Sequence, residues 1–159
     1  MTSEIIGFGN HDHACCIHDA MRMAEQTCAG AGAQFTPVRR RVLEILLESH
    51  AAMGAYDVLA RLEAEGLGSK PPVAYRALGF LVDHGLAHRI EKLNAFVACA
   101  HPGARHDPAF MICRTCGKVA EAEADAPFGN SAAQSGFQVE TTVIEAEGLC
   151  PGCQAGAAQ

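Results

Sequence analysis

No apolar run in the sequence approaches the ~20 residues that a membrane-spanning helix needs, so a membrane-spanning protein is excluded. The N-terminus lacks the basic flank and apolar stretch of a secretory signal, and we therefore expect a cytoplasmic protein. The motifs of phosphate-binding loops, serine hydrolases and zinc metalloproteases (GxxxxGK[ST], GxSxG and HExxH) are also missing. We therefore expect neither an enzyme nor a small-molecule substrate.

The chain is acidic overall but not evenly so. Its 159 residues carry a net charge of −6, which taken alone argues against a nucleic-acid partner. Residues 36–92 hold eight basic and seven acidic side chains, whereas residues 1–35 hold one and four, and residues 93–159 hold three and seven. The central segment is therefore the only part of the chain that does not repel a polyanion.

The first half of the chain predicts a winged helix-turn-helix. Thr36-Pro37 is a strong helix start, with Thr as N-cap and Pro at the first helical position, where its missing N–H is not needed. After Gly85 the apolar period shortens from that of a helix to that of a strand. We predict helices over residues 15–29, 36–49, 55–65 and from Lys70-Pro71-Pro72 to Gly85, and strands over 86–90 and 95–99. In such a domain the second helix of the pair enters the major groove of DNA.

The rest of the chain predicts a second, smaller unit. Residues 100–108 contain Pro and Gly without periodicity and indicate a hinge. Strands over 109–112 and 139–145, with a short helix over 126–134 between them, would form an α/β domain. The expected fold class is therefore α+β, with a flexible tail at 1–14, a winged-helix domain at 15–99, a hinge at 100–108, a second domain at 109–153 and a tail at 154–159.

Eight cysteines in a chain without an export signal indicate metal ligands or catalytic thiols more than disulfides. Four of them form two C-x-x-C pairs, Cys113 with Cys116 and Cys150 with Cys153. Each pair can bring two thiolates to one ion, and two pairs complete the tetrahedron that zinc prefers. Because the protein would fill all four positions, we predict a structural zinc site.

Other candidate ligands are scattered and ambiguous by spacing alone. A set of four could form a metal site, or could be a surface histidine, a core thiol and solvated polar groups; it comprises His88, Cys99, His106 and Glu121. The run from His11 to His18 is dense in His and Cys. It could hold a further zinc ion, but we favour a flexible tail whose residues share no ion.

Several short motifs occur in a recognisable order. They are Thr36-Pro37-Val38-Arg39, Ala55-Tyr56-Asp57-Val58-Leu59, Lys70-Pro71-Pro72, Tyr75-Arg76-Ala77-Leu78, Phe110-Met111-Ile112-Cys113 and Val143-Ile144-Glu145-Ala146, followed by Gly148-Leu149-Cys150. Over roughly residues 20–153 the chain resembles the zinc-sensing branch of the ferric uptake regulator (Fur) family. The resemblance implies a homodimeric repressor of zinc-uptake genes that reads double-stranded operator DNA with its winged helix and dimerises through residues 109–153.

The resemblance also implies a regulatory zinc at the hinge and hence two zinc ions per chain. Its ligands would be His88, Cys99, His106 and Glu121, with His101 as a competitor for the place of His106. A thiolate favours zinc over iron or manganese, whose sensors use nitrogen and oxygen donors. Iron-type members carry histidines where this chain has Ala52 and Phe110, so sensing of iron, manganese or peroxide is the weaker alternative. A zinc-ribbon adaptor is weaker still, because it would not need a winged helix.

Six residues are candidates for DNA contact. Arg76, near the start of the recognition helix, could bond a guanine edge in bidentate fashion. Tyr75 could contact a thymine methyl group or a sugar, or belong to the core, and Tyr56 is a candidate by resemblance alone. The candidates for phosphate contacts, each of which could equally be a solvated charge, are Lys70, Arg39 and Arg40.

Overall fold

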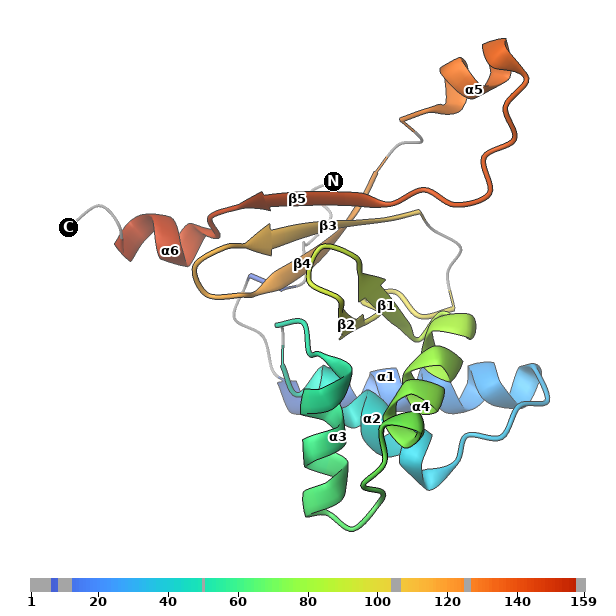
Figure 1. The fold of residues 1–159 in the computed structure, drawn as a ribbon, viewed down its shortest axis with the longest axis vertical. Helices are drawn as coiled ribbons and strands as arrows, with labels where there is room; N and C mark the ends of the chain where they lie inside the picture. Colours follow the sequence, from blue (N-terminus) through green and yellow to red (C-terminus); the bar gives the residue numbers. More distant parts are fainter. Residues whose placement is uncertain (1–6, 9–12, 50, 104–106, 125–126, 157–159) are drawn as a thin grey trace.

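The computed structural model describes residues 7–8, 13–49, 51–103, 107–124 and 127–156. In Figure 1 the first four helices form one end of the molecule, a sheet forms the other, and a hairpin lies between them. The elements in chain order are α1 (His13–Gly30), α2 (Pro37–Leu47), α3 (Ala55–Ala64), α4 (Pro71–Asp83), β1 (Ala87–Ile90), β2 (Ala95–Ala98), β3 (Pro108–Cys113), β4 (Val119–Glu123), α5 (Gly129–Ser135), β5 (Ile144–Gly148) and α6 (Pro151–Gly156). None of the described helices is both long enough and apolar enough to cross a membrane.

The N-terminal unit, α1 to β2, is a winged helix-turn-helix, as the sequence predicts. Thr36 caps α2 by accepting a hydrogen bond from the Arg39 N–H at 3.4 Å, and Pro37 follows at the first helical position. α4 begins at a double proline, and its N-cap residue, Lys70, makes no side-chain cap hydrogen bond. Gly85 adopts a φ of +68°, the left-handed conformation that ends the helix and turns the chain into β1.

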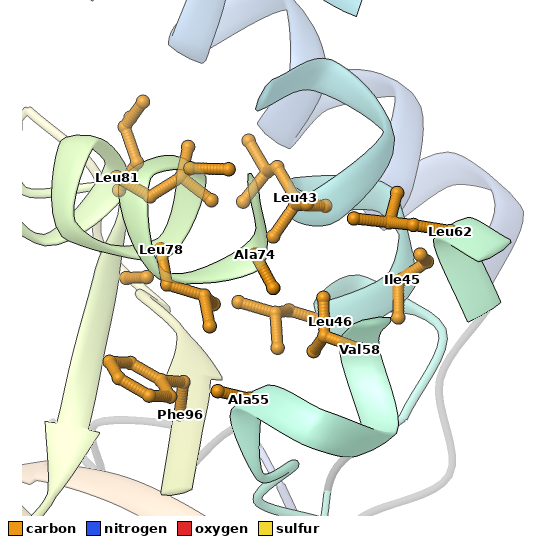
Figure 2. Close-up of a cluster of buried hydrophobic side chains, with 14 of the residues drawn as sticks. Leu43, Ile45, Leu46, Ala55, Val58, Leu62, Ala74, Leu78, Leu81 and Phe96 are labelled. Carbon is orange, nitrogen blue, oxygen red and sulfur yellow. The ribbon is translucent and has the colours of Figure 1, made fainter. Parts of the chain in front are cut away.

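A continuous apolar core joins the helices of this unit. Figure 2 shows side chains from α2, α3 and α4 meeting one another and Phe96 of β2. Ile45, Val58, Leu62 and Leu78 are fully buried at the centre of this contact. Full burial of an aliphatic side chain contributes roughly 1.5–3 kcal/mol, so the core fixes the angle between α3 and α4.

The hairpin and the C-terminal sheet are separate. β1 and β2 pair antiparallel around a turn in which Asn94 has a positive φ of 46°. The second sheet has the strand order β4-β3-β5, with β4 antiparallel and β5 parallel to β3. β5 is an edge strand, and α5 lies at the end of a projecting arm (Figure 1).

Three features of the C-terminal half differ from the sequence prediction. The strand expected over 139–145 is Ile144–Gly148 instead, and residues 137–143 form no regular structure, although Val139 and Val143 favour strands. β4 and α6 were not predicted at all. The helix expected over 126–134 is Gly129–Ser135.

The N-terminal segment also departs from the predicted tail. α1 begins at His13, within residues 1–14. Gly7 is buried against β4 with a φ of +138°, and a Cβ at this position would lie 2.7 Å from the carbonyl oxygen of Val119. A side chain at position 7 would therefore be both strained and sterically blocked.

Candidate metal centres and nucleic-acid face

The four cysteines of the C-x-x-C pairs converge on one point. Cys113 ends β3, Cys150 directly precedes α6 and Cys153 lies within it. The four sulfur atoms lie within 4.8 Å of one another, and Cys116 Sγ lies 3.7 Å from Cys150 Sγ. A tetrahedron with zinc–sulfur bonds of 2.3 Å has edges of about 3.8 Å, so the cluster fits a zinc ion.

The protein environment of this cluster stabilises the thiolate form of one cysteine. Backbone N–H groups of Cys116 and Cys150 donate to Cys113 and lower the pKa of its thiol to about 6. The hydrogen bond with Cys150 and then burial raise the pKa of Cys153 to about 12. Binding of a cation must therefore displace the proton of Cys153, and affinity for metal must increase with pH.

A second cluster joins the two parts of the molecule. His88 lies on β1 and Cys99 directly follows β2, whereas Glu121 lies on β4 of the C-terminal sheet. Their ligand atoms lie within 4.8 Å of one another, and His88 Nε2 is 3.4 Å from Glu121 Oε1. The other oxygen of Glu121 accepts a hydrogen bond from the Ala100 N–H at 2.8 Å. Sequence reasoning could not find this contact, because a backbone donor leaves no trace in the side-chain pattern.

The chemistry of this cluster suits a cation. Glu121 is only 7% exposed, and a buried carboxylate is unfavourable unless it is compensated. Burial and then the negative charge of Glu121 raise the pKa of Cys99 to about 12, against a lowering by the His101 N–H. An imidazole, a thiol and a carboxylate that share one buried point form a donor set of the kind that zinc accepts.

The predicted fourth ligand is one of two histidines. His106 lies outside the described residues. His101 is described and half-buried, but the group within the described part of the chain comprises only the other three residues. The choice between the two histidines therefore stays a prediction.

The soft-ligand run at the N-terminus is partly described. Cys15, Cys16 and His18 are exposed on α1, and Asp19 lies 3.9 Å from Cys15 Sγ and 3.8 Å from His18 Nδ1. These residues form no metal-ligand group of three within the described ranges. His11 lies outside those ranges.

The starts of α3 and α4 present a polar and aromatic surface. Tyr56 is 67% and Tyr75 48% exposed, and their rings meet edge to face with centroids 6.4 Å apart. Tyr75 is therefore not a core residue. Lys70 and Arg76 are exposed next to it, at the N-terminus and on the first turns of α4. This is the end of the recognition helix that reads bases in a helix-turn-helix.

Arg39 and Arg40 differ from these residues because they already have partners within the chain. Arg39 donates to the carbonyl oxygen of Gln34, and its guanidinium lies 3.7 Å from the centroid of the Phe80 ring. Arg40 pairs with Glu25. A phosphate contact by either arginine would have to replace or share these interactions.

Comparison with known proteins gives consistent matches. Residues 30–146 match the sequence profile of the Ferric uptake regulator family. The chain is 37% identical over 139 residues to the zinc uptake regulation protein of Escherichia coli (strain K12), which covers 85% of this chain and 81% of that protein. A solved structure of a zinc uptake regulator complexed with zinc and DNA matches at 36% identity with a TM-score of 0.84, over 90% of this chain and 98% of the other.

A third relative has solved structures in a holo and an apo form. The holo form of XcZur matches with a TM-score of 0.76 over 86% of this chain and 98% of that chain. The apo form of the same relative, at the same 35% identity, matches with a TM-score of only 0.51 over 88% and 99%. The present structure is therefore more similar overall to the holo form of this relative than to its apo form.

Proposed function

Because the chain belongs to the ferric uptake regulator family, we propose that it is a zinc-responsive transcriptional repressor. It would bind operator DNA as a homodimer when zinc occupies the hinge site, and so control zinc-uptake genes. The observation that carries this proposal is the buried group of His88, Cys99 and Glu121, to which both parts of the molecule contribute. A ligand held there favours one arrangement of the two parts over all others.

The hinge residues act as the sensor in this proposal. His88 and Cys99 belong to the winged-helix unit, so their positions move with the recognition helix, whereas Glu121 is fixed in the C-terminal sheet. Bound zinc supplies the positive charge that compensates the Glu121 carboxylate and the Cys99 thiolate. The resemblance of this structure to a holo relative rather than its apo form supports this assignment.

The donor set favours zinc over the iron, manganese and peroxide alternatives. A thiolate is a soft donor, and iron and manganese sensors rely on nitrogen and oxygen ligands. Ala52 and Phe110, where iron-type members carry histidines, pack instead in an apolar cluster. We further propose His106 as the fourth ligand and Cys113, Cys116, Cys150 and Cys153 as a separate structural site, which gives two zinc ions per chain.

The C-terminal half offers the surface for dimerisation. β5 is an edge strand whose outer side pairs with nothing in the described chain. Large apolar side chains on the arm and the segments beside it are exposed; they are Phe128, Phe137, Val139 and Val143. Exposed large apolar side chains beside an unpaired strand edge favour a protein interface, and a second copy of the chain is the partner that the family implies.

DNA recognition is assigned to the opposite end. Arg76 would bond a guanine edge, Tyr56 and Tyr75 would contact bases or sugars, and Lys70 would contact a phosphate. Arg39 and Arg40 are secondary candidates for phosphates. We propose a winged-helix domain over 15–99, a hinge over 100–108 and a dimerisation domain over 109–153, acting in the cytoplasm without enzymatic activity.

The test is a DNA-binding titration with the full chain at buffered free zinc. Fluorescence anisotropy on the upstream region of a zinc-transporter gene should show affinity at least 100-fold higher with zinc than without. Fe(II) or Mn(II) at equal free concentration should not substitute, and a scrambled duplex is the control. Equal binding with and without zinc would refute the sensing role, and a preference for Fe(II) or Mn(II) would move the protein to the alternative branch.

A further inference from the structure

One face of the C-terminal sheet carries two aligned rows of side chains. In the first row Phe110 of β3 pairs with Glu121 of β4 and with Glu145 of β5. In the second row Ile112 pairs with Val119 and Glu147. Directly paired residues point to the same side of a sheet, and alternate residues of a strand share that side. We call these six residues the docking face.

The hairpin of the winged-helix unit contacts both rows. The ring of His88 lies 5.4 Å from that of Phe110, centroid to centroid, beside Glu121. Ile90 and Val97 of the hairpin are buried together with Phe110, Ile112 and Val119. The docking face therefore makes an apolar contact between the two parts of the molecule.

Glu145 makes the polar part of this contact. Its two carboxylate oxygens accept hydrogen bonds from the backbone N–H groups of Glu91 and Lys92, at 2.6 and 2.9 Å. Both donors lie in the turn of the hairpin, 53 and 54 residues from Glu145 in the chain. Lys92 Nζ also lies 3.2 Å from Glu147 Oε2, in a pair that is exposed on both sides.

The two acceptors of the first row are geometrically coupled. Glu121 and Glu145 flank the same residue, Phe110, on neighbouring strands of one rigid sheet. Glu121 reaches His88 at one end of β1, and Glu145 reaches the turn that follows the other end. A single placement of the hairpin therefore satisfies both carboxylates, and movement of the hairpin away from the sheet breaks both contacts.

We propose that Glu145 is a positioning residue for zinc sensing. It holds the hairpin turn on the docking face and so raises the affinity of the hinge site for zinc. A carboxylate that accepts two N–H bonds forms charge-assisted bonds, which are stronger than neutral ones. Any contact that favours the arrangement in which the zinc ligands converge must also favour zinc binding, because linkage is reciprocal. The role in repression rests on the proposed function, but the effect on zinc affinity does not.

The test compares zinc affinities of full-length variants. Glu145→Ala removes both acceptors and Glu145→Gln retains one, whereas Glu140→Gln, an exposed carboxylate on the neighbouring arm, is the matched control. Chelator competition should show hinge-site affinity about tenfold lower in Glu145→Ala, less reduced in Glu145→Gln and unchanged in Glu140→Gln. Glu147→Gln should change it less than about twofold, because an exposed ion pair contributes little. The content of structural zinc and the dimer mass should not change.

The result that overturns the proposal is equal hinge-site affinity in Glu145→Ala and Glu140→Gln. Loss of the structural zinc or of the dimer in Glu145→Ala would also overturn it, since Glu145 would then support the C-terminal fold itself. Failure of the proposed function would give a different result. The wild-type protein would then bind DNA equally with and without zinc, while the chelator competition would still separate the zinc affinities of the variants.

Discussion

Replacement of Cys99 by Ser tests most directly whether the buried cluster senses zinc. The thiol is 5% exposed, and burial next to Glu121 raises its pKa to about 12, so without metal it is neutral at pH 7. Cys99→Ser therefore exchanges one neutral buried group for another of similar size. The charge of the apo state does not change, and the substitution removes mainly the sulfur ligand.

The size of the effect follows from linkage. A site held at 1,000 times its dissociation constant stabilises the binding-competent state by about 4.1 kcal/mol. If that stabilisation is lost, the ratio of the competent to other arrangements falls roughly 10³-fold, and DNA affinity falls with it. We expect Cys99→Ser to bind operator DNA at least 100-fold more weakly than wild type at saturating zinc, with no response to further zinc.

The assay pairs anisotropy at buffered zinc with a count of bound metal. Cys99→Ser should hold one zinc per chain, at the Cys113 cluster, where wild type should hold two. The matched control is Cys28→Ser, which makes the same chemical change at a thiol that is 1% exposed in the core of the winged-helix unit, away from the cluster. It should cost some stability but keep the zinc response. An unchanged zinc response in Cys99→Ser would refute the assignment, and unfolding of Cys99→Ser but not of Cys28→Ser would make Cys99 structural.

Three further predictions concern other parts of the molecule. Arg76→Ala should cost about 1–3 kcal/mol of operator binding and relax specificity at one base pair. Lys70→Ala should instead weaken binding to all sequences and lower the slope of log K against log salt by roughly 1. Anisotropy at several salt concentrations measures both effects. Cys113→Ser should abolish the structural zinc site and reduce dimer mass in light scattering, since β5 and α6 meet at this cluster. Hydrogen bonds from Arg41 hold the pKa of Glu65 below its ordinary value of 4.5, so this pair contributes stability above pH 4.5 that is lost as pH falls through the lowered value. Arg41→Met should therefore lower stability slightly at pH 7 and flatten that acid dependence in denaturant titrations.

The parts of the fold that the sequence predicts are those with local causes. The helix starts at Thr36-Pro37 and at the double proline before α4 depend on neighbouring residues, and the apolar period of each helix identifies its buried face. The C-x-x-C pairs are equally local, because a tight turn brings both sulfurs together whatever surrounds it.

The parts that sequence reasoning missed depend on distant partners. β4 consists mainly of alanine and glutamate, which have low strand propensity, and it forms because β3 supplies its hydrogen bonds. The β-branched residues of 139–143 have the opposite property, with strand propensity but no partner strand in the described chain. The hinge ligands come from three separate elements, so only resemblance to a family could join them.

The acidic side chains of the C-terminal half have a structural role that the net charge of the whole chain does not reveal. Three of its carboxylates, those of Glu121, Glu145 and Glu147, lie on the docking face and contact the hairpin. Burial of Glu121 next to a thiol is unfavourable without a compensating cation. In the proposed mechanism, this cost makes the arrangement of the two parts depend on metal. Glu145 would favour the same arrangement without metal, through its hydrogen bonds with the hairpin turn. The two carboxylates together would then determine the zinc concentration at which the winged helix is held in place. The net charge of the whole chain argues against DNA binding. In the proposed mechanism, however, acidic side chains of the C-terminal half are the groups that control the DNA-binding half.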